Sequence, residues 1–267
     1  MTAREQDDRP EASPERERRP GPQGRKKKSG SQGFFVAAGV GAVLVVALIL
    51  VLAVMWPKEK AEKREAQEER VPMSRPAVTG MAPDSYSSSP SSAVFAGIAT
   101  REEDPAPLTA KEMFPEKDTL QDDVSGAKPA LRLSVLDDDC GKAVWGAGLG
   151  EVLQDGGCTQ AVRGLYSDEK KGFRVLVAVY NLRNEDAANR AVEAFGAGSG
   201  GFVKLPSKTP KGFGEDFSLA RGLAMGHYAL ITWAERTDGE GEGTSKSLLS
   251  LVVTAAKAEG LYARAAG

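Results

Sequence analysis

The two cysteines of the chain, Cys140 and Cys158, bound a glycine-rich stretch, CGKAVWGAGLGEVLQDGGC, whose residue types allow three kinds of chemistry. The glycines could cradle a phosphate, but the stretch lacks the G-x-G-x-x-G spacing and the G-K-[ST] ending of nucleotide-binding loops. The thiols could hold a metal, but a metal site needs more ligands, and His227 is the single histidine. We therefore predict a disulfide and neither a metal nor a cofactor. Two buried free thiols are the alternative.

A disulfide places a condition on the helix that the sequence predicts between the cysteines. A continuous helix from Cys140 to Gln154 would be about 21 Å long. The next four residues span about 13 Å, whereas bridged Cα atoms lie within roughly 7 Å of each other. The bridge thus requires a shorter or bent helix that begins after Cys140. Gly146, Gly148 and Gly150 favour a break, because each glycine lowers helix stability by about 1 kcal/mol relative to alanine.

Acidic residues are the remaining candidates for catalysis. With one histidine, the sequence has no Ser/His/Asp or Cys/His grouping and no H-E-x-x-H motif, so we assign no catalytic residue and predict no enzyme. The alternative is a cell-envelope enzyme that uses Asp137–Asp139, or Glu215 and Asp216, for acid–base chemistry. Three adjacent acids before a helix are, however, typical of a helix cap.

Large side chains within the predicted strands are candidates for a binding face. On an exposed sheet face, these residues could contact an envelope protein or a glycan. The alternative is packing in the core and at the sheet edge, with the arginine paired or extended toward solvent. The candidates are Arg163, Tyr166, Tyr180, Tyr228 and Trp233.

The elements that must position these residues follow from the hydrophobic pattern after residue 108. A capping box at Thr109–Glu112 predicts a short helix packed on the domain edge through Leu108, Met113 and Phe114. Alternation in ALRLSVL predicts a strand, and CTQAVRGLY and FRVLVAVYNL predict a hairpin whose second strand is central. A helix capped by Asn184, the strand GHYALITWAER and a closing helix follow.

The order β-α-β-β-α-β followed by a helix predicts an α+β domain of ferredoxin-like topology. Such a domain has a four-stranded antiparallel sheet with helices on one face. We expect GAGSGGF and KTPKGFGEDF to be loops or irregular edge structure.

Residues 34–56, FFVAAGVGAVLVVALILVLAVMW, predict one transmembrane helix, because an uncharged helix of this length extends about 34 Å. No small-x-small cleavage site follows it, so we expect a retained signal-anchor. Lysines and arginines within 15 residues number five on each side, so charge alone leaves the orientation tied. The expected disulfide breaks the tie, because it requires an oxidising, extracytoplasmic compartment for the C-terminal part.

The rest of the chain divides around this helix. Residues 1–33 predict a disordered, basic cytoplasmic tail, 57–107 a stalk and a disordered Pro/Ser-rich linker, and 108–267 the extracytoplasmic domain. The net charge of −2 argues against a nucleic-acid partner. The lipid bilayer is the partner that the sequence predicts most directly.

The segments LTAKEMFP, DC…GCTQAVRGLY and VYNLRNEDAA together resemble uncharacterised single-pass membrane proteins of actinobacterial type, over about residues 108–267. The resemblance implies an extracytoplasmic domain with a paired-cysteine motif and carries no reaction. We therefore expect a bitopic membrane protein that presents a non-catalytic binding or sensing domain at the cell envelope. A carboxylate-dependent envelope enzyme and a self-associating structural protein are the alternatives.

Overall fold

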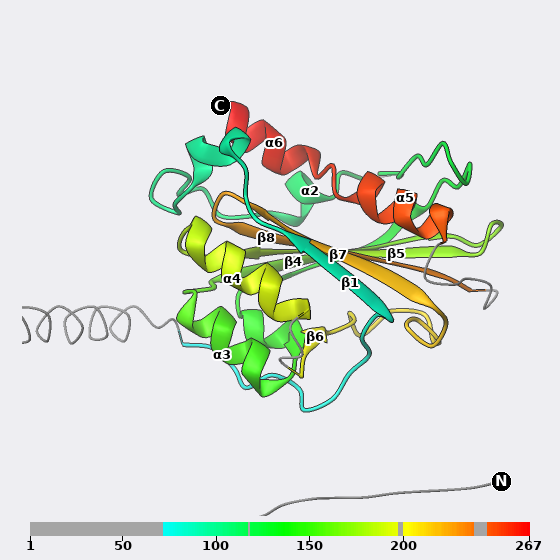
Figure 1. Cartoon of the computed structure of the whole chain (residues 1–267), viewed down its shortest axis with the longest axis horizontal. Helices are drawn as coiled ribbons and strands as arrows, with labels where there is room; N and C mark the ends of the chain where they lie inside the picture. The colour runs from blue at the N-terminus through cyan, green and yellow to red at the C-terminus, as the bar shows by residue number, and fades with distance from the viewer. Residues whose placement is uncertain (1–71, 117, 197–199, 238–244) are drawn as a thin grey trace, which may run out of the picture. The chain divides into compact units, whose positions relative to one another are not determined.

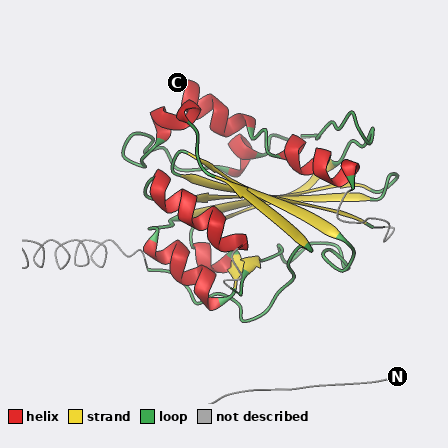
Figure 2. Ribbon diagram, in the orientation of Figure 1, coloured by secondary structure: helices red, strands yellow, loops and turns green. Residues whose placement is uncertain are grey.

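The computed structural model describes residues 72–116, 118–196, 200–237 and 245–267. These residues form an α+β domain around a mixed six-stranded sheet (Figure 1, Figure 2). In spatial order its strands are β1 (Ser85–Ser89), β7 (Ser218–Met225), β8 (Tyr228–Arg236), β5 (Phe173–Asn181), β4 (Gln160–Asp168) and β2 (Ala130–Asp137). A second, small sheet pairs β3 (Val144–Trp145) with β6 (Phe202–Val203).

Helices cover both faces of the large sheet (Figure 1). One face, here called the clasp face, packs against α3 (Ala147–Asp155), α4 (Glu185–Gly196), β3 and β6. The other, the cavity face, packs against η1 (Ala93–Ile98), α2 (Ala110–Met113), α5 (Lys246–Ala255) and α6 (Glu259–Ala266).

Strand β5 shows how one strand serves both faces. Leu176, Ala178 and Tyr180 belong to the core of the clasp face. Val175, Val177 and Val179 belong to the core of the cavity face. Successive side chains of a strand point to opposite faces, so a strand covered on both sides is apolar throughout. The prediction of a central position for this strand is confirmed, because β5 lies between β8 and β4.

The ferredoxin-like prediction is wrong in strand number, in helix placement and in topology. The sheet has six strands and helices on two faces. That topology also needs a crossover between parallel strands at its first helix, but β2 and β4 pair directly and antiparallel. The disulfide lies at this connection. It holds Cys140, just after β2, with its Cα 6.1 Å from that of Cys158, just before β4, so the chain returns to the sheet where it left.

The second half of the domain does contain one crossover. Strands β5 and β7 each pair antiparallel with β8, so they are parallel to each other with β8 between them. Helix α4 connects β5 to this region and begins as predicted, because the side chain of Asn184 accepts a hydrogen bond from the Ala187 N–H at 2.9 Å. Loss of this cap would expose the first turn to fraying.

The predicted disordered linker needs correction over its described part, residues 72–107. This segment contributes the edge strand β1, which pairs parallel with β7, and the turn η1. Its few large side chains attach it to the domain. Phe95 and Ile98 are buried, and the Tyr86 hydroxyl donates a hydrogen bond to the Val192 carbonyl at 2.5 Å. The ordered domain therefore extends well before the predicted boundary at residue 108.

Within the ranges described above, no helix combines the length and apolarity needed to cross a membrane. The predicted transmembrane helix at 34–56, the tail at 1–33 and the start of the stalk lie outside the described residues.

Candidate functional site

Cys140 and Cys158 form the predicted disulfide. The expected break in the helix is also confirmed, because α3 begins at Ala147, after Gly146, whose φ of 92° favours glycine. Both sulfur-bearing side chains are buried, and Asp139 caps the short turn η2 (Cys140–Lys142) by accepting a hydrogen bond from the Gly141 N–H. The motif is therefore a structural clasp.

The five candidates for an exposed binding face are all buried, each with 4% or less of its surface exposed. They also lie on different faces. Arg163, Tyr180 and Trp233 point to the clasp face, whereas Tyr166 and Tyr228 point to the cavity face. Helices cover both faces, so these side chains do not form an exposed face, and core packing is the role that the structure gives them.

The acids considered for catalysis have structural partners. Asp137 forms an ion pair with Arg163 at 2.6 Å on the clasp face, and neither side chain is more than 14% exposed. Asp138 pairs with Lys142 at the surface, and Asp139 serves as the cap. Asp137–Asp139 thus hold the end of β2 to its neighbours, and the three carboxylates face different partners.

Asp216 instead lies near a carboxylate that sequence reasoning missed, Glu235 at the end of β8. The Glu235 side chain has no exposed surface, and it accepts hydrogen bonds from the Gly214 N–H at 2.5 Å and from Arg174 at 3.3 Å. Burial raises the pKa of Glu235 to about 7, while the Gly214 N–H and Arg174 act in the opposite direction. This carboxylate therefore titrates near neutrality on the clasp face.

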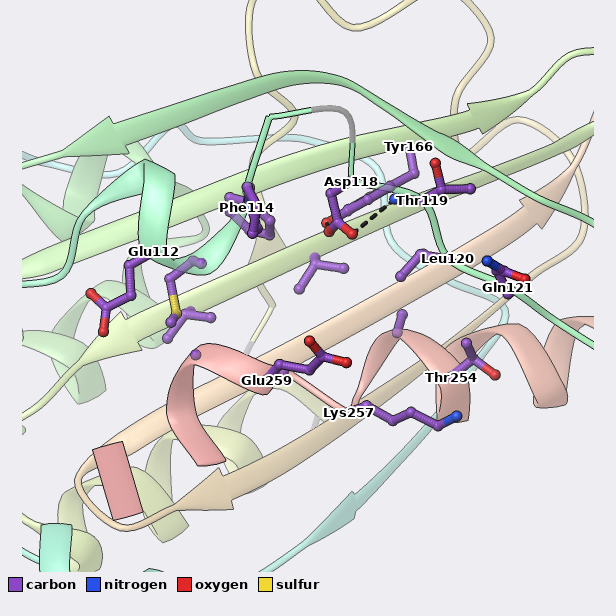
Figure 3. Close-up of a pocket in the computed structure, with 17 residues that line it drawn as sticks. Glu112, Phe114, Asp118, Thr119, Leu120, Gln121, Tyr166, Thr254, Lys257 and Glu259 are labelled. Carbon is purple, nitrogen blue, oxygen red and sulfur yellow. Dashed lines mark hydrogen bonds between the residues drawn. The ribbon is translucent and has the colours of Figure 1, made fainter. Parts of the chain in front are cut away.

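A cavity of about 330 Å³ lies on the cavity face (Figure 3). Three segments far apart in the sequence enclose it: α2 with the loop that follows, the sheet at β4 and β5, and the junction of α5 and α6. Phe114, Leu120, Val177, Val179 and Ala255 make part of its wall apolar. A concave site of this size, in which apolar side chains and polar groups converge, can hold a small molecule.

Asp118 is the half-buried carboxylate of this cavity, and its orientation is fixed by two hydrogen bonds (Figure 3). One oxygen accepts from the Thr119 N–H at 2.8 Å, and the other accepts from the Tyr166 hydroxyl at 2.5 Å. Burial, together with the hydrogen bond to Asp118 and its charge, raises the pKa of Tyr166, so the phenol stays protonated and remains a donor. Lys257 and Glu259 are exposed and stand at the rim.

Local sequence explains how the cavity walls are placed. Thr109 caps α2 by accepting a hydrogen bond from the Glu112 N–H, as predicted, and Phe114 packs beneath it. The predicted single closing helix is two helices, because Ala258 adopts the left-handed conformation, with φ 32°, between α5 and α6.

Arg264 ties α6 to α2 and so fixes the width of the cavity. Its guanidinium bonds Glu112 at 2.5 and 2.8 Å and Asp104 at 2.9 Å, and it also donates to the Tyr228 hydroxyl and the Pro107 carbonyl. The hydrogen bonds that Arg264 donates to Glu112 and Asp104 raise its pKa, so it stays charged. This arginine joins segments that are more than 150 residues apart in the chain.

Sequence reasoning missed Asp118 and the cavity because their residues belong to no motif. Two local features lie beside the cavity, namely the capping box of α2 and the break between α5 and α6. Among the residues that the structure describes, no group of three or more His, Cys, Asp or Glu side chains is placed to hold a metal. Comparison with protein-family models, curated proteins and solved structures found no match for this chain.

Proposed function

We propose that the chain is a single-pass membrane protein that presents a non-catalytic binding or sensing domain on the extracytoplasmic side of the cell envelope. The cavity beside Asp118 is the ligand site of that domain. The cavity carries this proposal, because it combines an apolar wall with an oriented carboxylate and a phenol. The disulfide supports the extracytoplasmic location, since such bonds persist in oxidising compartments.

The position of the cavity suits a sensing role. A ligand in it contacts α2 with its following loop and also the α5–α6 junction, so its binding energy favours one spacing of these segments. A cavity of about 330 Å³ accepts a small molecule, or one group of a larger partner such as an envelope protein or a glycan.

Two observations make this proposal preferable to its alternatives. A carboxylate enzyme built on Asp137–Asp139 would have to free Asp137 from Arg163 and Asp139 from its cap. Self-association through a sheet face would have to displace helices, because both faces are covered.

The test is a cavity-filling substitution at Thr254, which lines the cavity from the last turn of α5. We expect Thr254→Trp to abolish binding of tryptophol, a neutral indole alcohol, to the full-length protein in lipid nanodiscs. Val253→Trp is the matched control, because Val253 is the adjacent, 46% exposed residue of the same helix and lies outside the cavity wall. Saturation-transfer NMR, with the signal from empty nanodiscs subtracted, measures the binding.

Wild-type protein and Val253→Trp should give the same tryptophol signal, and Thr254→Trp should lose it. Equal signals from all three proteins would place the indole elsewhere and contradict the proposed site.

A further inference from the structure

We propose that the cavity selects a small organic cation, namely an ammonium group carried on an apolar body. This inference rests on the proposed function and specifies the chemical class of its ligand.

The first support is the charge of Asp118. Among the described residues, the Thr119 N–H and the Tyr166 hydroxyl donate hydrogen bonds to this carboxylate, both donors are neutral, and no ion pair involves it. A carboxylate that is partly withdrawn from water gains stability from a nearby cation. Each oxygen uses one of its lone pairs in these bonds, so both retain capacity to accept from an ammonium group.

The second support is the aromatic pair beside this carboxylate. The rings of Phe114 and Tyr166 are 6.2 Å apart and meet edge to face at 70°. Figure 3 shows Asp118 and Phe114 on the same side of the cavity as Tyr166. The face of an aromatic ring attracts cations, and aromatic rings next to a carboxylate are a recurrent way to bind ammonium groups.

The third support is that, among the described residues that line the cavity, no lysine or arginine forms an ion pair with Asp118. Arg264 is engaged with Glu112 and Asp104. Lys257 is exposed at the rim, and its side chain extends away from Asp118 (Figure 3). Glu259 adds an exposed carboxylate at the rim, so Asp118 and Glu259 outnumber the single lining cation, Lys257, after Arg264 has offset Glu112.

The apolar side chains of the lining determine the second property of the ligand, which is its apolar body. Val177 and Val179 of β5 and Leu120 contribute apolar surface to the lining. A body of one or two rings fills a large part of about 330 Å³ and removes its apolar surface from water.

Three probes that share an indole body test the inference: tryptamine is a cation, tryptophol is neutral, and indolepropionate is an anion. We expect the full-length protein in nanodiscs to bind tryptamine about tenfold more tightly than tryptophol, because a hydrogen bond to a charged group is worth about twice a neutral one. Indolepropionate should bind most weakly. Competition in saturation-transfer NMR, corrected for empty nanodiscs, ranks the three.

Asp118→Asn should lower tryptamine affinity about tenfold and change tryptophol affinity by less than about twofold. Asp138→Asn is the matched control, since it removes the same charge at a surface position whose side chain is 91% exposed. Glu259→Gln removes an exposed rim carboxylate, is expected to fold, and should lower tryptamine affinity by about threefold.

The outcomes separate the inference from the proposed function. Equal binding of all three probes, with Thr254→Trp still blocking them, would overturn cation selectivity and keep the site. Tighter binding of indolepropionate would overturn it as well. Failure of every probe to bind wild-type protein would instead count against the site itself. If Asp118→Asn does not fold, an unchanged tryptamine affinity in Glu259→Gln, with no preference over tryptophol, overturns the inference.

Discussion

The clasp face is held by a covalent bond and by close packing, whereas the cavity face is held by a polar network that leaves space. On the clasp face, the chain before β1 lies directly on the disulfide loop. The Ser74 N–H donates to Asp139, and a Cβ atom placed at Gly150 would come within 2.3 Å of Pro76. An aromatic chain continues this packing, with Phe202 edge to face against both Phe195 and Trp233.

The cavity face reaches its order by different means. Arg264 joins α6 to Glu112 and Asp104, and the helices around it leave about 330 Å³ unfilled. The space between these helices is therefore a pocket that is partly open to solvent, since exposed residues such as Lys257 and Glu259 belong to its lining. Under the proposed function, the clasp face would serve as a fixed support and the cavity face as the part that responds to a ligand.

The largest expected effect tests the polar network. Arg264→Met should lower the free energy of unfolding by about 3–5 kcal/mol, because it leaves Asp104 and Glu112 without their partner in a region where the arginine side chain is only 10% exposed. Urea unfolding followed by circular dichroism measures the loss. Lys257→Met, at the exposed rim, should change stability by less than about 0.5 kcal/mol.

A loss below about 1 kcal/mol in Arg264→Met would mean that apolar packing, not the network, holds the cavity walls. The proposed difference between the two faces would then not hold for the cavity face.

The next effect tests the clasp. Replacing both cysteines by alanine should lower the free energy of unfolding by about 3 kcal/mol, because the bridge closes a loop between residues 18 apart. The same double variant should keep wild-type tryptophol affinity in its folded fraction, since the cavity lies across the sheet. Weaker binding at full folding would show that the two faces are coupled.

Sequence patterns predicted those strands and helices whose own residues show apolar periodicity or a helix cap. Strand β8 and helix α4 were both predictable, because their apolar periodicity and the Asn184 cap are local. Strand β7 was missed, because Gly222 faces Tyr86 and a Cβ there would lie 1.9 Å from the Tyr86 hydroxyl oxygen. The packing of β7 thus depends on a residue contributed by another segment.

The topology and the site depend on contacts that no local pattern records. The disulfide was predicted, but the direct antiparallel pairing of β2 with β4 beside it was not. The cavity needs Asp118, Tyr166 and Thr254 to converge from three segments. Each of these residues is ordinary in its own stretch of sequence, so only the three-dimensional structure identifies them as a group.

The clasp face also carries a pH dependence through Glu235. The pKa of Glu235 is raised by burial from 4.5 to about 7, so the folded state binds this proton more tightly than the unfolded state does. The contribution of Glu235 to the free energy of unfolding has its full value below about pH 4.5, and it is lost as the pH rises to about 7. The groups that face it are Arg174, Asp216 and the Gly214 N–H.

We therefore expect Glu235→Gln to remove this dependence. The unfolding free energy of the variant, relative to wild type, should rise by about 2–3 kcal/mol between pH 4.5 and pH 8. Urea titrations across this range measure the difference, and subtracting the two proteins cancels groups that titrate in both. Parallel curves would show that Arg174 keeps Glu235 ionised throughout.

The smallest effect concerns the junction of α5 and α6 at the cavity rim. Ala258 is left-handed, and it is the one non-glycine residue with positive φ among those described. Left-handed backbone is unfavourable for alanine by about 1–2 kcal/mol, and glycine adopts it freely but loses about 0.5–1 kcal/mol more chain entropy on folding. Ala258→Gly should therefore raise the unfolding free energy by about 0.5–1 kcal/mol, measured by urea unfolding.

Ala258→Gly also tests whether the left-handed conformation of this junction affects ligand affinity. Gly260, two residues on, serves as the opposite control, because a Cβ there would meet Met113 Cε at 2.1 Å and Gly260→Ala should weaken the packing of α6 on α2. If Ala258 holds the rim in its binding geometry, Ala258→Gly should stabilise the fold yet weaken tryptophol binding about twofold, because a freer junction must be ordered again when the ligand binds. Stabilisation without any loss of affinity would show that the α5–α6 break is set by Arg264 and the helix packing alone.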